Sequence, residues 1–119
     1  MFISANLLNA SFEFVKPQNA NFNYSQLQNV NFENAQLQNA VFCNADLQNT
    51  IFCNADLQYA NFEFVNFNKD YNNIDEAIFG NTLWNEKTNF KGTFFENKTI
   101  EELTKIMGNP PIHNNERLK

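Results

Sequence analysis

The chain has 119 residues, with thirteen acidic side chains against eight basic ones and a formal net charge of −5. This length fits one domain at most. The acidic balance disfavours nucleic-acid binding, which needs clustered Lys and Arg. The sequence has no long apolar run and no basic amphipathic segment, so neither a membrane span nor a membrane-surface helix is indicated.

Residues 1–68 form an internal repeat with a period of five. Every fifth residue from Phe2 to Phe67 is Phe or Leu, with Pro17 as the exception. A small residue, most often Ala, stands two positions before each of these from Leu7 on, and the other three positions are mostly polar. A strict internal period determines the architecture before any other signal does.

A period of five fits neither a helix nor a continuous strand. Five helical steps advance about 500°, which would spread the apolar residues around the whole cylinder. In a strand, an odd period would send successive repeats to opposite faces. Within one repeat, however, the small residue and the Phe or Leu have strand spacing onto one side. The pattern therefore predicts short extended pieces joined by corners, wound into a solenoid with two residues in five inside.

The stretches AQLQN (35–39), ADLQN (45–49), ADLQY (55–59) and ANFEF (60–64) resemble the A(D/N)LXX motif of pentapeptide-repeat proteins. The resemblance implies an all-β solenoid, a right-handed quadrilateral β-helix with four pentapeptides per coil. Residues of the same type would then stack in ladders, two aromatic and two aliphatic. Pro17 departs from the pattern, and we expect it to distort the first coil because proline cannot donate a ladder hydrogen bond.

After the regular repeat, residues 69–76 break the register and are predicted to form a loop. The five-residue rhythm then returns in a shifted frame, which predicts a less regular final coil over 77–98 with an extra Lys87. A competing interpretation makes 74–79 a short helix, capped by Asn73 and stopped by Gly80.

The sequence TIEE at 99–102 is a capping box, and Gly108 is placed to end the helix that it opens. We expect a short capping α-helix over 99–108, which covers the end of the solenoid because terminal caps are typical of repeat arrays. A partner-binding helix is the alternative. Residues 109–119 are polar and are expected to be a loose tail, so that the whole chain is one domain.

At the other end, no capping segment is expected before the first coil. That coil would present Phe2, Leu7 and Phe12 and an unpaired strand edge to water, and such an edge favours pairing with another chain. The hypothesis is a homodimer through the N-terminal coil. The alternative is that Met1, Ile3 and Pro17 disorder the edge enough to prevent pairing.

The residues offer little for catalysis, which predicts no enzyme, no cofactor and no metal site. The only His, His113, lies in the tail, far from any nucleophile it could activate. Cys43 and Cys53 are half a coil apart and should point outward from opposite faces, too far apart for a disulfide or a shared metal. Reduced thiols fit a reducing compartment, and a cytoplasmic location is expected.

Aromatic residues at outward or corner positions are the more suggestive surface feature, because exposed aromatics favour partner recognition. The possible partner contacts are Phe14, Tyr24, Tyr59, Phe64 and Tyr71. Alternatively, these rings turn inward or pack under the 69–76 loop.

The favoured function is a non-catalytic protein–protein interaction module or scaffold, with an unknown protein partner. Because some pentapeptide-repeat proteins mimic DNA, the alternative is a mimic that binds or protects a topoisomerase such as gyrase. A structural element with no dedicated partner is a third option.

Overall fold

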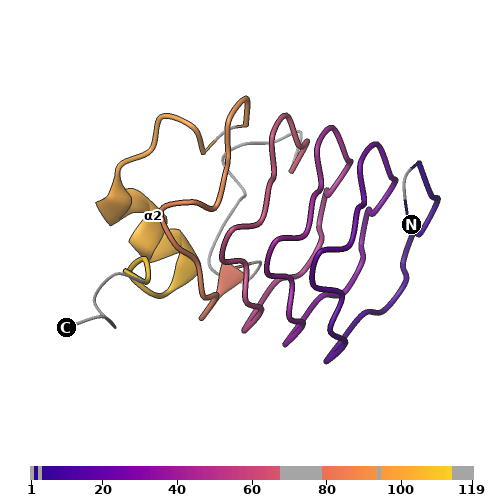
Figure 1. Ribbon diagram of the computed structural model, residues 1–119, viewed down its shortest axis with the longest axis horizontal. Coiled ribbons are helices and arrows are strands. Elements are labelled where there is room, and N and C mark those ends of the chain that lie inside the picture. The colour runs from indigo at the N-terminus through magenta and orange to yellow at the C-terminus, as the bar shows by residue number, and fades with distance from the viewer. Residues whose placement is uncertain (1, 3, 68–78, 94, 114–119) are drawn as a thin grey trace.

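The computed structural model describes residues 2, 4–67, 79–93 and 95–113. The described chain is a short solenoid whose coils lie side by side along the longest dimension of the molecule, 43 Å. Figure 1 shows the N-terminus at one end of this axis and the single labelled helix, α2, at the other. The stack of coils therefore runs from the N-terminal segment to α2.

Successive coils pair in parallel with a constant offset of twenty residues. Isolated bridges join Asn6 to Gln26, Gln26 to Asp46 and Asp46 to Asn66, and the other sides of the coil repeat this register. The pairing consists of single bridges rather than long strands, because a turn occupies most of each five-residue repeat. Four repeats therefore make one four-sided coil.

Each corner is a four-residue turn with the same hydrogen bond. The N–H of Ala35 donates to the C=O of Phe32 at 3.0 Å, and that of Ala40 donates to Leu37 at 3.0 Å. In the regular coils the third residue of each turn has a positive φ of about 60°; Asn34 and Asn39 are examples. A positive φ at this position is the requirement of a type II turn, which Gly and Asn meet best.

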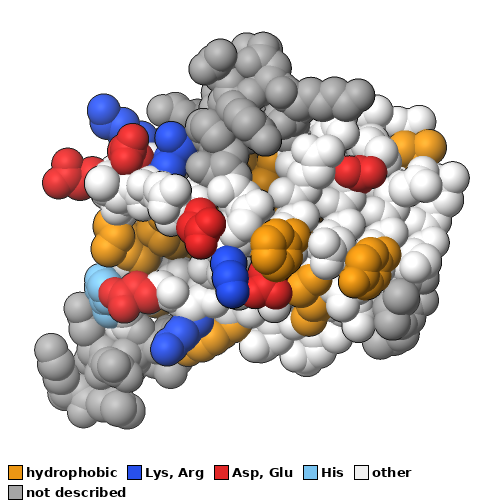
Figure 2. All heavy atoms as spheres, turned by 90° about the horizontal axis from the view of Figure 1, so that it is seen from above, with side chains coloured by type: hydrophobic (Ala, Val, Ile, Leu, Met, Phe, Trp, Pro, Cys, Tyr) orange, Lys and Arg blue, Asp and Glu red, His pale blue; other side chains and the backbone are white. Residues whose placement is uncertain are grey.

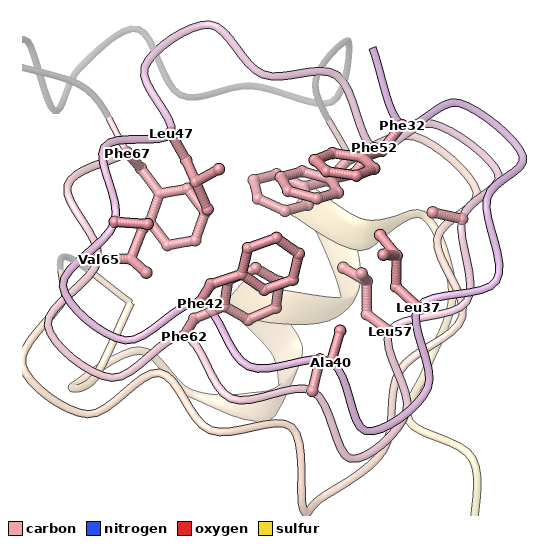
Figure 3. Packing of buried hydrophobic residues seen from close by; sticks show 14 of the residues in the cluster. Phe32, Leu37, Ala40, Phe42, Leu47, Phe52, Leu57, Phe62, Val65 and Phe67 are labelled. Atoms are coloured by element: carbon pink, nitrogen blue, oxygen red, sulfur yellow. The ribbon is translucent and has the colours of Figure 1, made fainter. Parts of the chain in front are cut away.

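Inside the coils, the predicted ladders are present (Figure 3). The Phe22 and Phe42 rings stack at 5.0 Å, as do Phe42 and Phe62, while Phe32 and Phe52 stack at 5.5 Å on the opposite side. Rings on facing sides meet edge to face. Because offset and edge-to-face contacts are the favourable arrangements of aromatic rings, the interior is one continuous aromatic array flanked by Leu ladders.

Pro17 disturbs the first coil less than we expected. On either side of it the backbone keeps the regular pattern: the N–H of Asn19 donates to Gln38 at 3.0 Å, and that of Gln36 donates to Val15 at 3.0 Å. Only the hydrogen bond that the proline nitrogen cannot donate, and the bridge beside it, are missing among the described residues. The fixed φ of proline is compatible with the extended conformation required here.

Residues 79–98, as far as they are described, continue the four ladders as a final coil. Phe79 stacks on Phe52 at 5.4 Å, and Phe90 stacks on Phe62 at 5.4 Å. The extra Lys87 widens one corner, where the side-chain oxygen of Asn85 accepts from the N–H groups of Lys87 and Thr88. Of the competing helix over 74–79, only Phe79 lies among the described residues, and its backbone is helical. The predicted loop at 69–76 lies outside them.

The helix α2 runs over Ile100–Met107 and closes the C-terminal end of the solenoid. Thr99 and Glu102 form both hydrogen bonds of the capping box, and Gly108 ends the helix with φ +80°. The Thr99 hydrogen bonds lower the pKa of the Glu102 carboxyl, since they stabilise its charged form. Leu103 and Met107 are buried against the last coil, in agreement with a capping role.

Part of the tail also covers this end, so the expectation of a loose segment does not hold for residues 109–113. Ile112 forms a parallel bridge with Asn85 and donates its N–H to the C=O of Trp84 at 2.8 Å. The indole N–H of Trp84 donates to the C=O of Asn109 at 2.7 Å. The last coil therefore has a paired edge as well as a covered interior. None of the described helices has the length and apolar character needed to span a membrane.

Candidate functional site

The exposed aromatic side chains of the described solenoid all stand at corners. Phe14 is 69% exposed, Tyr24 63%, Phe64 52% and Tyr59 44%. Of the residues predicted as partner contacts, these four point outward rather than into the core, and Tyr71 lies outside the described residues. The rings are thus available for contact with another molecule.

These aromatics occupy the strained position of the corner turns, with φ between 58° and 64°. Asn fills that position at eight of the thirteen corners between residues 4 and 64, and Asn tolerates positive φ far better than a bulky side chain does. A Phe or Tyr at such a site costs of the order of 1–3 kcal/mol, and strain of this kind clusters at functional sites. The sequence does contain the signal that reveals these positions, namely Asn recurring five residues apart, but we had not predicted their conformation.

The four exposed aromatic rings do not form a single cluster. The register places Phe14 on one corner of the coil and Tyr59 on a second, whereas Tyr24 and Phe64 share a third. We call this third column, formed by Ser4, Tyr24, Asn44, Phe64 and Gly92, the aromatic corner. Tyr24 and Phe64 are two coils apart, which is about 10 Å at the spacing of paired strands.

Gly92 is the next residue of the aromatic corner, and its missing side chain makes room for the Phe64 ring. A Cβ at Gly92 would overlap a ring carbon of Phe64, and Gly92 itself has φ +75°. A hollow of about 520 Å³ opens beside the ring, lined mainly by Phe64, Val65, Asn66 and Thr93. The Phe64 ring therefore packs against the Gly92 backbone on one side, while about half of its surface remains accessible.

The surroundings of the aromatic corner are mostly polar and uncharged. Figure 2 shows the hydrophobic side chains of one face as separate islands, with most of the visible Lys, Asp and Glu side chains on the half of the molecule nearer α2. Cys43 and Glu63 lie beside the corner on successive coils, since Asn44 donates its N–H to the C=O of Glu63 at 3.0 Å. Burial, and to a lesser degree the Glu63 carboxylate, raises the pKa of the Cys43 thiol.

We predict that Cys43 reacts slowly with alkylating reagents. Because its pKa is raised, the reactive thiolate appears only at higher pH than for an ordinary cysteine. In a Cys53→Ser background, the pH profile of iodoacetamide labelling should have its midpoint above that of a small thiol. Glu63→Gln should move the midpoint part of the way back, because it removes the smaller of the two causes. A midpoint at or below that of the small thiol would contradict the prediction.

A second hollow, of about 590 Å³, lies at the C-terminal end between the last coil and α2. Its apolar floor includes Trp84, Phe90 and Ile100, and its charged residues include both Lys87 and Glu86. Glu86 also contacts the imidazole of His113 at 3.0 Å. The mixed charges give this hollow no preference for either sign of ligand.

For metal binding, the described residues bring no suitable groups together. They contain no cluster of three or more His, Cys, Asp or Glu side chains that could hold a metal ion. Cys43 and Cys53 are not joined by a disulfide, and the twenty-residue register places them on opposite sides of the coil. The described residues thus form a repeat solenoid whose outer faces and corner side chains are exposed for contact with another molecule.

The comparisons with known proteins agree with this class. The pentapeptide-repeat pattern matches residues 2–35 and 35–69, with eight copies. The chain therefore belongs to the pentapeptide-repeat family, as the resemblance of its motifs had implied. Proteins of this family are generally structural or interaction modules. No curated protein sequence matches the chain.

Two solved structures from the cyanobacterium Nostoc are similar to it in fold. HetL, a pentapeptide-repeat protein involved in the regulation of heterocyst differentiation, aligns with a TM-score of 0.56 at 18% identity, over 76% of this chain and 42% of HetL. The pentapeptide-repeat protein alr5209 aligns with a TM-score of 0.51 at 22% identity, over 93% of this chain and 84% of that one. The chain thus spans less than half the length of HetL, and at these identities the likeness concerns the fold alone.

Proposed function

We propose that this protein is a non-catalytic protein–protein interaction module and that its docking surface is the aromatic corner. The observation that carries the proposal is the exposure of Tyr24 and Phe64 at positions where the repeat otherwise favours Asn. A stability requirement alone would select Asn or Gly there. We take the coils to wind in the right-handed sense that the family resemblance implies. For the location we propose a reducing compartment such as the cytoplasm, because the two cysteines are not joined by a disulfide.

Rigidity supports this function. Tyr24 and Phe64 each lie in a turn that is closed by a backbone hydrogen bond, and each is also joined to the next coil. Tyr24 donates its N–H to the C=O of Cys43 at 3.0 Å, and Phe64 donates its N–H to the C=O of Lys91 at 2.8 Å. A partner that docks on such a surface orders few groups on this side, which reduces the entropic cost of binding. Tyr24 and Phe64 then act as two anchors at a fixed separation.

The alternative, a DNA mimic that binds a topoisomerase such as gyrase, receives less support from the surface. A mimic needs a dense acidic face, but the acids of the regular coils are distributed over all four sides. Glu13 and Glu33 share one side, while Asp46, Asp56 and Glu63 lie on the three others. Binding by such a mimic would weaken steeply with salt, whereas binding by an aromatic and amide surface would not.

The test is a pull-down from native lysate at low and high salt with three baits, followed by mass spectrometry. The baits are the unmodified protein, Tyr24→Asn and, as the matched control on another corner, Tyr59→Asn. Because Asn suits a positive φ, Tyr24→Asn should unfold at the same or a slightly higher temperature than the unmodified protein. We expect a partner that is retained at both salt concentrations by the unmodified bait and by Tyr59→Asn, and that is reduced at least about tenfold with Tyr24→Asn, as is typical for an aromatic anchor.

Two results would overturn the proposal. Equal capture by all three baits would remove the aromatic corner from the binding surface. A topoisomerase captured only at low salt would replace the proposal with the mimic.

A further inference from the structure

The aromatic corner presents its two rings at a fixed spacing along the axis of the solenoid. Tyr24 and Phe64 are two coils apart in one column, and Asn44 stands between them. The hydrogen bonds that join these coils at the corner, from Tyr24 to Cys43 and from Asn44 to Glu63, are both 3.0 Å long. Since paired strands are about 4.8 Å apart, the backbone positions that carry the two rings are about 9.6 Å apart.

This spacing distinguishes between the regular conformations that a docked peptide could have. An extended strand returns a side chain to the same side after about 6.8 Å and again after about 13.6 Å, and neither value fits. A polyproline II helix returns a side chain to the same side every third residue, after about 9.3 Å. An α-helix does so after seven residues, or about 10.5 Å. The spacing of the rings therefore leaves the polyproline II helix and the α-helix.

The residue between the two rings separates these two conformations. Asn44 is exposed, and its side-chain amide carries two N–H donors. The backbone carbonyls along an α-helix accept hydrogen bonds from the helix itself. A polyproline II helix has no internal hydrogen bonds, so its carbonyls are free to accept from another molecule. A donor placed between two aromatic rings therefore favours the polyproline II helix.

We propose that the aromatic corner binds a proline-rich segment of its partner in the polyproline II conformation. Prolines three residues apart lie against Tyr24 and Phe64, and the Asn44 amide donates to a carbonyl of the segment between them. The inference rests on the proposed function and names the chemistry of the partner at that same surface. Because such a segment is already extended before it binds, little conformational entropy is lost when it docks on exposed aromatic rings.

Both rings have room for this contact. The Tyr24 side chain is 63% exposed and that of Phe64 is 52% exposed. Beside Phe64 lies the hollow of about 520 Å³, which Val65, Asn66 and Thr93 also line. A proline ring can therefore contact Phe64 from the side of this hollow, opposite to no charged side chain among those that line it.

The charges around the corner indicate which proline-rich segment fits best. Glu63 directly precedes Phe64, and Asp46 lies on the side of the coil that follows the corner. A carboxylate thus stands on each side of the column, while Lys91 lies one coil further on. A basic residue between the two prolines would be attracted by these carboxylates. Exposed ion pairs contribute at most about 1 kcal/mol, so binding should keep most of its strength at high salt.

The test is a fluorescence-polarisation titration of the full chain against a labelled peptide of four Pro-Pro-Arg repeats, in which a proline recurs every third residue. A peptide of Gly-Gly-Arg repeats has the same charge without the polyproline II conformation, and Pro-Pro-Glu repeats have the conformation with the opposite charge. We expect the Kd of the Pro-Pro-Arg peptide to be lower by at least about tenfold than that of the Gly-Gly-Arg peptide. Relative to the Pro-Pro-Glu peptide it should be lower by roughly threefold to fivefold.

Substitutions in the corner then test each contact. Tyr24→Asn and Phe64→Asn should each raise the Kd of the Pro-Pro-Arg peptide by at least about tenfold. Asn44→Gly, which keeps a residue suited to positive φ but removes the amide, should raise it by roughly threefold to tenfold. The matched controls are Tyr59→Asn and Asn54→Gly, at exposed positive-φ positions of other corners, and both should leave the Kd unchanged.

Equal binding of the Pro-Pro-Arg and Gly-Gly-Arg peptides would overturn the inference. An Asn44→Gly variant that binds like Asn54→Gly would also overturn it, because the contact that selects the polyproline II helix would then be absent. The pull-down separates this inference from the proposed function. If the peptides do not bind but Tyr24→Asn still loses a partner from lysate, only the inference fails; if Tyr24→Asn changes neither measurement, both fail.

Discussion

Replacing Phe42 with Ala should lower the free energy of unfolding by about 3–5 kcal/mol, the range for a large aromatic removed from a closed core. The Phe42 side chain has no exposed surface. It stacks on Phe22 and Phe62 at 5.0 Å each and meets Phe32 and Phe52 edge to face. The ladders above and below are held by backbone hydrogen bonds, so the cavity cannot collapse freely. Urea unfolding followed by circular dichroism measures this loss.

The matched control is Phe12→Ala, which truncates the same side chain in the partly exposed first coil. Phe12 stacks on one ring only, that of Phe32, and solvent fills much of the space that it leaves. We expect a loss of about half that of Phe42→Ala or less, measured at a protein concentration at which the chain is monomeric. Equal decreases in the free energy of unfolding for the two variants would contradict the difference in burial between Phe42 and Phe12.

Gly108→Ala should lower the free energy of unfolding by at least about 2 kcal/mol. Gly108 ends α2 with φ +80°, and a Cβ there would lie 2.7 Å from the backbone nitrogen of Asn81. That nitrogen belongs to a corner of the last coil and cannot move without breaking its turn. Thermal or urea unfolding should show a less stable protein, because the substitution pushes α2 away from the core that Leu103 and Met107 cover.

Gly92→Ala provides the comparison, because Gly92 has a similar φ of +75° but a different neighbour. The obstructing atoms there belong to the Phe64 ring, which is 52% exposed and can rotate away. We expect a smaller loss, of about 1 kcal/mol from the backbone conformation alone, and little further change when Gly92→Ala is combined with Phe64→Asn. If Gly92→Ala lowered the free energy of unfolding as much as Gly108→Ala, the type of atom next to the new methyl group would not determine the cost of the substitution.

The sequence predicts the coils well because one local pattern is repeated thirteen times. The Phe and Leu positions, including Phe22, Leu27 and Phe32, all lie inside as their spacing requires. The helix α2 can be predicted equally well from the sequence, since Thr99, Glu102 and Gly108 carry local signals for its start and end. In both cases the information lies within a few residues of the feature that it determines.

What the sequence did not reveal depends on residues far apart in the chain. The pairing of Ile112 with Asn85, and the hydrogen bond from Trp84 to Asn109, join the tail to a coil more than twenty residues earlier, and no local pattern marks either partner. For the candidate site, the spacing identified Tyr24 and Phe64 as outward residues, but the gap that Gly92 leaves for the Phe64 ring appears only when the coils are stacked.

The constant offset between paired residues determines how this protein can vary in length. Because Gln26 pairs with Asp46 and Asp46 pairs with Asn66, loss of a single five-residue repeat would bring Leu under Phe along every ladder beyond that point. Loss or duplication of twenty residues would instead keep each ladder in phase and leave the α2 end intact. A whole coil is therefore the unit in which such a gene can lengthen or shorten its product without remaking the interior.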